Sequence, residues 1–477
     1  LLAINIGGAL QPLFDVGSVA LFVHGIQWIG YTLHFPDWLT IFLAQGLGGG
    51  INTVLPLVPQ IGMMYLFLSF LEDSGYMARA AFVMDRLMQA LGLPGKSFVP
   101  LIVGFGCNVP SVMGARTLDA PRERLMTIMM APFMSCGARL AIFAVFAAAF
   151  FGQNGALAVF SLYMLGIVMA VLTGLMLKYT IMRGEATPFV MELPVYHVPH
   201  VKSLIIQTWQ RLKGFVLRAG KVIIIVSIFL SAFNSFYLSG KIVDNINDSA
   251  LASVSRVITP VFKPIGVHED NWQATVGLFT GAMAKEVVVG TLNTLYTAEN
   301  IQDEEFNPAE FNLGEELFSA IDETWQSLKD TFSLSVLMNP IEASKGDGEM
   351  GTGAMGVMDQ KFGSAAAAYS YLIFVLLYVP CISVMGAIAR ESSRGWMGFS
   401  ILWGLNIAYS LATLFYQVAS YSQHPTYSLV CILAVILFNI VVIGLLRRAR
   451  SRVDIELLAT RKSVSSCCAA STTGDCH

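Results

Sequence analysis

The sequence predicts an all-α polytopic membrane protein, with about eight transmembrane helices plus two re-entrant broken helices in an inverted repeat. Of the 477 residues, 55% are hydrophobic and only 13% are charged, whereas soluble domains carry about 25% charged residues. Glycine or proline interrupts several of the apolar segments. The net charge of −3 says little about partners, because the placement of Lys and Arg orients a membrane protein more than their sum does. We expect the lipid bilayer as a partner and no nucleic acid.

The apolar segments are long enough to give the helix count. About 20 apolar residues cross a bilayer. Two segments, 97–117 and 274–297, are long enough to enter the membrane but contain glycine breaks or adjacent charges, so we expect them to be re-entrant. The eight predicted spans are 13–33, 46–71, 125–151, 155–181, 215–237, 367–389, 396–419 and 427–446.

The short basic loops predict the orientation of the chain. If each re-entrant segment returns to the face from which it entered, all the short basic segments fall on one side of the membrane. These are the loops 72–124 and 182–214, the pair Arg390 and Arg394, and the run "RRARSR". Positive-inside bias then places both ends of this chain in the cytoplasm. The insert 298–364 falls on the opposite side. The chain opens at Leu1 inside an apolar run, without Met, so we interpret it as a piece whose upstream portion has been removed.

Two similar membrane units are separated by polar segments. In each unit a span, a re-entrant segment and a closing span follow one another, and both closing spans carry a cysteine near a proline. The two re-entrant segments enter from opposite faces in this scheme, which is the inverted repeat that places sites near the bilayer midplane. The predicted organisation is a first membrane unit (1–181), an interfacial segment (182–214), the first part of a second unit (215–297), an acidic then Gly-rich insert (298–364), closing helices (365–446) and a polar Cys-containing tail (447–477).

The candidate site lies at the breaks. A helix break in hydrocarbon frees N–H and C=O groups that protein or a wet cavity must satisfy, and an intramembrane carboxylate is a functional candidate. We therefore predict a metal-ion site from Cys107, Cys136, Cys381 and Glu286. Thiolate, carboxylate and carbonyl ligands together suit a first-row transition ion better than Ca²⁺ or Mg²⁺. The residues that break or gate the helices are Gly104, Gly106, Asn108, Pro110, Pro132, Lys285 and Pro380.

Purely structural roles compete with this interpretation. Proline kinks are tolerated in membrane helices, and Lys285 and Glu286 can form an internal ion pair. Cys431 has no polar neighbours in sequence, so we expect it to be an inert buried thiol. The tail, with Cys467, Cys468, Cys476 and His477, is expected to be disordered more often than metal-binding.

Four motifs carry a resemblance to a known family. "GFGCNVPSVMGARTL", "APFMSCGARLAIF", "GAMAKEVVVGTLNTLY" and "YVPCISVMGAIARE" resemble the Gate-type segments of FeoB, the family of bacterial ferrous iron transporters. The resemblance runs over essentially the whole chain. It implies Fe²⁺ uptake across the bacterial inner membrane, with GTP and Mg²⁺ bound only by an N-terminal domain that precedes this chain. It also implies small cytoplasmic accessory proteins as partners. A homo-oligomer is a separate option that the sequence leaves open.

Two other functions compete with iron transport. Gate-type segments also occur in proteins linked to nucleosides, so a nucleoside or other organic-solute carrier is the alternative; base recognition, however, would favour amides and aromatics over thiols. A cysteine enzyme is disfavoured, because no histidine lies within the spans near the three thiols and a buried thiol without a base is a poor nucleophile. "GLPGKS" (92–97) lacks the glycine spacing of a phosphate-binding loop, so we expect no GTP site in this chain.

Overall fold

The computed structural model describes residues 9–36, 40, 42–182, 196, 198–221, 224–225, 228, 250–283, 285, 287–297, 313–331 and 352–470. Over these residues the fold is helical and contains no strand, which confirms the all-α prediction. Six of the described helices or helix pairs are long and apolar enough to cross a membrane. They are Gln11–Thr32, Pro121–Phe151, Gly155–Thr180, Ala365–Glu391, Arg394–Ala419 and Pro425–Arg448.

The other two predicted spans do not appear as single described helices. Span 46–71 is divided at Leu55 and Pro56 into a π-helical stretch and two helices, η2 (Phe42–Gly48), α5 (Gly49–Val54) and α6 (Leu57–Asp73). The proline explains the division, because it lacks the N–H that a continuous helix needs. Span 215–237 lies largely outside the described residues.

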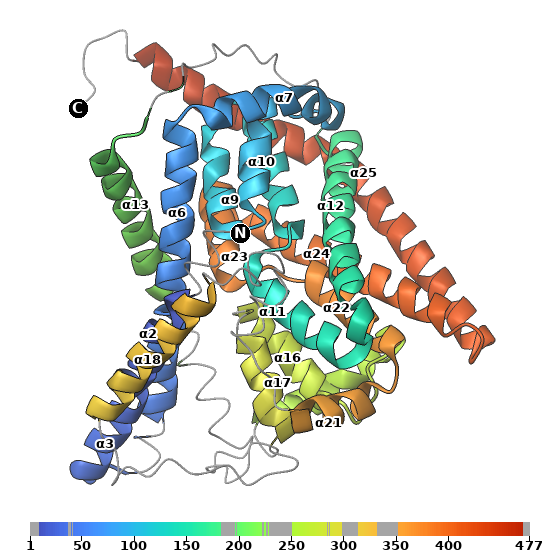
Figure 1. The fold of residues 1–477 in the computed structure, drawn as a ribbon. Helices are drawn as coiled ribbons and strands as arrows, with labels where there is room; N and C mark the ends of the chain where they lie inside the picture. The colour runs from blue at the N-terminus through green and yellow to red at the C-terminus, as the bar shows by residue number, and fades with distance from the viewer. Residues whose placement is uncertain are drawn as a thin grey trace.

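The N-terminal helices form an arm with part of the polar insert. α2 (Gln11–Ser18), η1 (Val19–His24) and α3 (Gly25–Thr32) run continuously. The insert contains an amphipathic helix, α18 (Leu313–Thr331), which packs against α2. His24 Nδ1 lies 2.9 Å from Glu316 Oε1, joining the two segments. Figure 1 shows this arm at the lower left, beside the main bundle. The remainder of the predicted insert 298–364 is described only from residue 352.

The first unit contains a helix that lies across one end of the bundle (Figure 1) and two broken helices. α7 (Tyr76–Leu91) is bounded by Gly75 and Gly92, both left-handed at φ 80° and 78°, a conformation that suits glycine. Figure 1 shows α7 lying across the upper end of the bundle. The elements that follow are η3 (Gly95–Ser97), α8 (Phe98–Val103), α9 (Asn108–Gly114), η4 (Ala115–Thr117), α10 (Pro121–Met130), η5 (Ala131–Phe133), α11 (Gly137–Phe146), η6 (Ala147–Phe151), η7 (Gly152–Asn154) and α12 (Gly155–Thr180).

The second unit repeats the pattern of a helical pair followed by a broken closing helix. The pair α16 (Trp272–Met283) and α17 (Val287–Thr297) precedes α22 (Ala365–Leu377) and α23 (Ile382–Glu391). Ser364 and Ser393 cap α22 and α24 by accepting hydrogen bonds from Ala367 N and Trp396 N. The remaining elements are α13 (Val201–Phe215), η8 (Val216–Gly220), α15 (Ala250–Ile258), η10 (Thr259–Ile265), α21 (Thr352–Phe362), α24 (Arg394–Ala419) and α25 (Pro425–Ala470).

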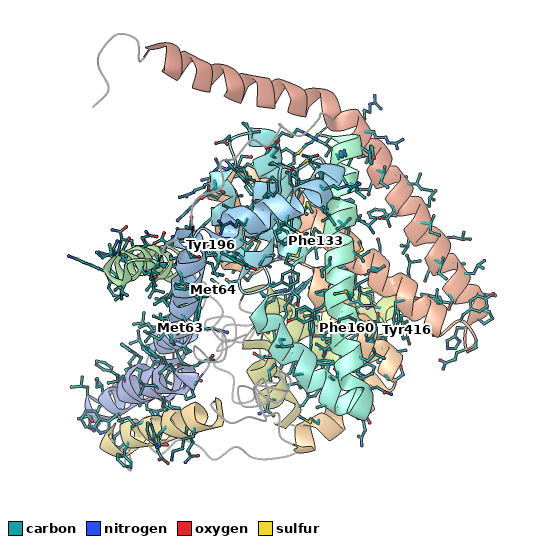
Figure 2. All side chains as sticks on the ribbon, turned by 45° about the horizontal axis from the view of Figure 1, so that its top comes forward. Met63, Met64, Phe133, Phe160, Tyr196 and Tyr416 are labelled. Carbon is teal, nitrogen blue, oxygen red and sulfur yellow. The ribbon has the colours of Figure 1, made fainter. Side chains whose placement is uncertain are left out.

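The two units share one apolar core. Side chains from α10, α11, α12, α22 and α24 form a continuous buried cluster, in which Phe146 stacks on Tyr371 at 5.4 Å between ring centroids. α12 contributes one face to this core and α25 packs against its outside, and the outward faces of both helices carry exposed apolar residues such as Phe160, labelled in Figure 2. α25 continues into the segment 447–477, which was predicted to be a polar tail. The shared core holds the breaks of both units in place.

Candidate functional site

The first break lies between α8 and α9, where the sequence predicted it. Gly104 and Gly106 permit close approach, because an added Cβ would lie 3.0 Å from Leu101 O at the first and 2.9 Å from Met64 Sδ at the second. Figure 2 places Met64 on α6. Cys107 is extended, with φ −153° and ψ 132°, and immediately precedes α9. The backbone therefore leaves the helix at Gly104 and re-enters it at Asn108.

The second break lies in the first closing helix and touches the first. Gly137 N donates a hydrogen bond to Gly106 O at 3.3 Å. Asn108 is buried, and with its amide nitrogen turned toward the carbonyls it donates to Gly104 O at 2.9 Å and Ala131 O at 3.1 Å. Asn108 therefore satisfies a carbonyl from each break, which gives this predicted residue a defined structural role.

A buried arginine stabilises the second break, and sequence reasoning did not select it. Arg139 has no exposed surface. Its guanidinium donates to Pro132 O at 3.2 Å and Met134 O at 3.0 Å, the carbonyls freed by the break. The available signal was an arginine inside an apolar span, since intramembrane charges are rare and functional.

A buried lysine has the parallel position in the second unit. Lys285 lies between α16 and α17 and is 3% exposed. Its Nζ donates to Val375 O at 3.3 Å, near the end of α22, and lies 4.5 Å from the centroid of the Tyr378 ring. Glu286 lies outside the described residues, so neither its predicted role as a ligand nor the Lys285–Glu286 pair is tested.

The three predicted thiols share one position in the backbone. Cys107, Cys136 and Cys381 each immediately precede a helix that resumes after a break, namely α9, α11 and α23. All three are half-buried and none is in a disulfide. Pro110, Pro132 and Pro380 are buried nearby in the same segments. α9 packs against α23, and α11 packs against α17 and α22. The breaks of both units are therefore contiguous.

The structure brings backbone breaks together rather than a ready-made ligand cluster. Within the described part of the chain, no group of three or more His, Cys, Asp or Glu side chains is placed to hold a metal ion. The predicted set of three cysteines and Glu286 stays a prediction. What the arrangement offers chemically is thiols, carbonyl groups and two buried cations that pair with those carbonyls.

A carboxylate that sequence reasoning missed joins the two units beyond the breaks. The Glu391 side chain, at the end of α23, is 2% exposed and forms ion pairs with Arg116 and Arg124. Arg116 Nε lies 2.6 Å from Glu391 Oε2, and Arg124 Nη2 lies 2.7 Å from the same oxygen. The hydrogen bond to Glu391 raises the pKa of Arg116. These partners are far apart in sequence, which is why the pattern alone did not reveal them.

Comparisons with known proteins agree with the resemblance seen in the motifs. The Gate family, described as "Nucleoside recognition", matches residues 54–150 and 216–394, together more than half of the chain. The family "Ferrous iron transport protein B C terminus" matches residues 159–211. No solved structure matches the chain.

Several curated relatives carry the name Fe(2+) transporter FeoB. The protein from Escherichia coli O6:H1 is 99% identical over 100% of this chain, and that from Salmonella typhimurium is 94% identical over the same length. The protein from Legionella pneumophila is 49% identical over 94% of the chain. The chain spans 62% of the length of the first two relatives and 59% of the third.

Proposed function

Because this chain belongs to the Gate family and matches FeoB proteins along its whole length, we propose that it is the part of a bacterial iron transporter through which Fe²⁺ crosses the inner membrane. The observation that carries the proposal is the convergence of backbone breaks from both units, three of which place a cysteine just before the resumed helix. Thiols and carbonyls suit a first-row transition ion, and the low place of Fe²⁺ in the affinity order suits transit, because a transported ion must also leave.

The breaks supply ligands without leaving the backbone unsatisfied. Arg139 and Asn108 pair with carbonyls at the first two breaks, and Lys285 pairs with a carbonyl beside the last. Carbonyl oxygens have two lone pairs, so a carbonyl already bonded to one of these side chains can also face a passing cation. Entry of a divalent ion is favoured by about 4.6 kcal/mol at 100 mV, inside negative, taking roughly 2.3 kcal/mol per charge. The protein needs to supply a selective, gated path.

The thiols are proposed as the selective element. We call the pair α8 and α9 the first hairpin and the pair α16 and α17 the second hairpin. In this proposal Cys107, Cys136 and Cys381 line the path, and Glu286, between α16 and α17 in sequence, attracts the cation. Serine in place of cysteine keeps the size but offers a harder, weaker ligand.

Fe²⁺ flux into liposomes that contain the full-length protein tests this proposal. The Cys107/Cys136/Cys381 triple serine variant should lose most uptake while its yield and unfolding temperature stay normal. Cys431→Ser, in α25 and outside the breaks, is the matched control and should transport like the unaltered protein. Near-normal uptake by the triple variant would refute the thiol path and leave only the carbonyls.

The alternative is a nucleoside carrier, which the description of the Gate family favours. Competition separates the two functions. Excess Co²⁺ should inhibit Fe²⁺ uptake, whereas excess nucleoside should not. Accumulation of labelled nucleoside in the same liposomes, unaffected by the triple serine change, would favour the alternative.

We propose further that the units form an inverted repeat with both ends of this chain in the cytoplasm. Support comes from Figure 1, in which α9 lies in the upper half of the bundle and α16 and α17 in the lower half. Ser319 lies on an exposed part of α18. A single cysteine at this position, in a cysteine-free background, should react with an impermeant reagent in intact spheroplasts. Reaction only after lysis would contradict the scheme.

GTP and Mg²⁺ are proposed to act through the remaining part of the longer relatives, since this chain spans 62% of their length. The segment 92–97 supports this assignment, because it follows the end of the helix α7 and contains the turn η3, whereas a phosphate-binding loop follows a strand. Labelled GTP should bind the full-length protein and not this chain alone. We also propose small accessory proteins as partners and a homo-oligomer as the assembly. The liposomes with the full-length protein can test both, by adding the accessory proteins and by measuring the oligomeric state.

A further inference from the structure

A cavity of about 570 Å³ lies beside the first broken helix, and Val103 and Pro110, on either side of the first break, are among its lining residues. Its walls come from α6, α7, α8, α9 and the Arg211 side chain of α13. Its volume is within the range of small-molecule sites, about 300–1,000 Å³.

The cavity is charged at one end and apolar at the other. Glu72 lies at the end of α6, where it pairs with Arg211 of α13. Tyr65 lies seven residues earlier in α6, about 10 Å deeper along the helix axis. Lys96 precedes α8 and Arg116 follows α9, so these cations lie at the same end as Arg211. The deeper wall is made of apolar side chains, among them Leu68, Val99, Val103 and Met113.

The charged end carries three cations and one carboxylate, Glu72. Each cation has an acidic partner: Arg211 binds Glu72 at 2.9 Å, Arg116 binds Glu391, and Lys96 lies 3.6 Å from Asp119, whose side chain is 94% exposed. Such an exposed pair contributes little. A guanidinium has five N–H donors, so both arginines can bind an anion while keeping their partners. Among the lining residues three cations face one carboxylate, since Glu391 and Asp119 do not line the cavity; this disfavours a divalent metal ion here and favours an anionic group.

The surroundings of the cavity are those of the membrane interface. Apolar side chains on α7, including Phe82 and Val83, are 58% and 76% exposed. α13 packs along α6 and exposes Ile205 and Trp209. An amphipathic helix that lies across the end of a bundle, as α7 does (Figure 1), is found at the headgroup level. The cavity therefore opens where a lipid headgroup and the start of its acyl chains are found.

We propose that this cavity binds one anionic phospholipid. Lys96, Arg116 and Arg211 bind the phosphate, and an acyl chain lies on the apolar wall toward Tyr65 and Val103. Basic pockets between membrane helices are known to hold acidic lipid headgroups. The bound lipid would fill the space between α6, α13 and the first broken helix.

Native mass spectrometry of the full-length protein in a mild neutral detergent tests the proposal. Phosphatidylglycerol should bind at least about tenfold tighter than phosphatidylethanolamine, and the Lys96→Gln/Arg211→Gln variant should lose that preference by a similar factor. Lys263→Gln removes a cation that pairs with Glu269 outside the cavity, and this control should bind phosphatidylglycerol like the unaltered protein.

A second variant and a second probe distinguish a lipid in the cavity from lipid bound elsewhere and from a simple anion. Ala78→Phe fills the cavity but keeps every cation, so it should also release the lipid if the cavity is the site. Each variant should unfold at the unaltered temperature in the absence of lipid. Equal retention of phosphatidylglycerol by the unaltered protein and both variants would overturn the proposal. If millimolar inorganic phosphate displaced the lipid and raised the unfolding temperature as much as the lipid does, the cavity would be a simple anion site. That result would also overturn the proposal.

Discussion

The two closing helices break beside a cysteine in both units, but their freed carbonyls are satisfied in different ways. In the first unit Arg139 belongs to the broken helix itself and binds Pro132 O and Met134 O across the break. In the second unit Lys285 comes from the neighbouring hairpin and binds Val375 O. The closing-helix break of the first unit therefore has a donor from its own helix in addition to the contacts with the α8–α9 break, whereas the break of the second unit is bridged by Lys285 from a neighbouring element. We infer that the second unit is the one that can rearrange at lower cost.

The largest expected effect is that of Arg139→Met, because it removes the donors for two buried carbonyls. Each unsatisfied buried group costs about 1–3 kcal/mol, so the unfolding temperature of the full-length protein in detergent should fall strongly, with reduced yield. Arg139→Lys restores a cation and part of the hydrogen bonding, and should recover part of the loss. An unchanged unfolding temperature for the methionine variant would contradict the role of Arg139 at the break.

Lys285→Met should destabilise the protein less, because one carbonyl loses its donor, at about 1–3 kcal/mol. Since Lys285 joins the hairpin to the closing helix, Fe²⁺ uptake should fall by a larger factor than the folded yield. Lys285→Arg keeps the donor and should retain most uptake. If Lys285→Met lowers the unfolding temperature as far as Arg139→Met does, the proposed difference between the units is wrong.

The glycines of the two hairpins offer a finer comparison. A Cβ at Gly281 would lie 2.5 Å from the Tyr378 hydroxyl oxygen and 2.7 Å from Val288 Cγ2, whereas at Gly106 the closest atom is the sulfur of Met64, at 2.9 Å. Methionine adapts easily, whereas a buried tyrosine and a branched valine do not. Gly281→Ala should therefore lower the unfolding temperature by several degrees and Gly106→Ala by less. The reverse order, measured under the same conditions, would show that the first hairpin is the tighter one.

The smallest effect is expected outside both units. Removal of Ser465 to His477 deletes no candidate membrane span and no break, so uptake should be nearly unchanged. Lost uptake at normal protein levels would assign the thiols of the tail a function.

The predicted breaks could be recognised from sequence because Gly104, Gly106, Pro132 and Pro380 are local signals. The same local signals placed Cys107, Cys136 and Cys381 beside the breaks, and the structure adds that each immediately precedes the resumed helix. Pro56 is a similar local signal for the division of the span 46–71, but the apolar residues around it led us to predict one continuous helix.

Other features depend on distances that no local pattern contains. Glu391 meets Arg116 and Arg124 across more than 260 positions of sequence, and Lys285 meets Val375 across 90. The helix α18 in the polar insert has an amphipathic pattern that the sequence shows, but that its partner is α2 is known only from the structure.

The thiol of Cys381 immediately precedes the half-helix α23, and the buried carboxylate of Glu391 lies at its last residue. Ten helical residues span about 15 Å, and the same element packs along α9, which itself runs from Cys107 toward Arg116. The two half-helices therefore couple the membrane face to the thiols as rigid rods. The Glu391 side chain is nearly closed to solvent, whereas the side chains of Arg116 and Arg124 are 52% and 33% exposed, so salt screens these partly buried pairs less than it screens fully exposed ones. This coupling should therefore weaken only modestly from dilute buffer to concentrated salt.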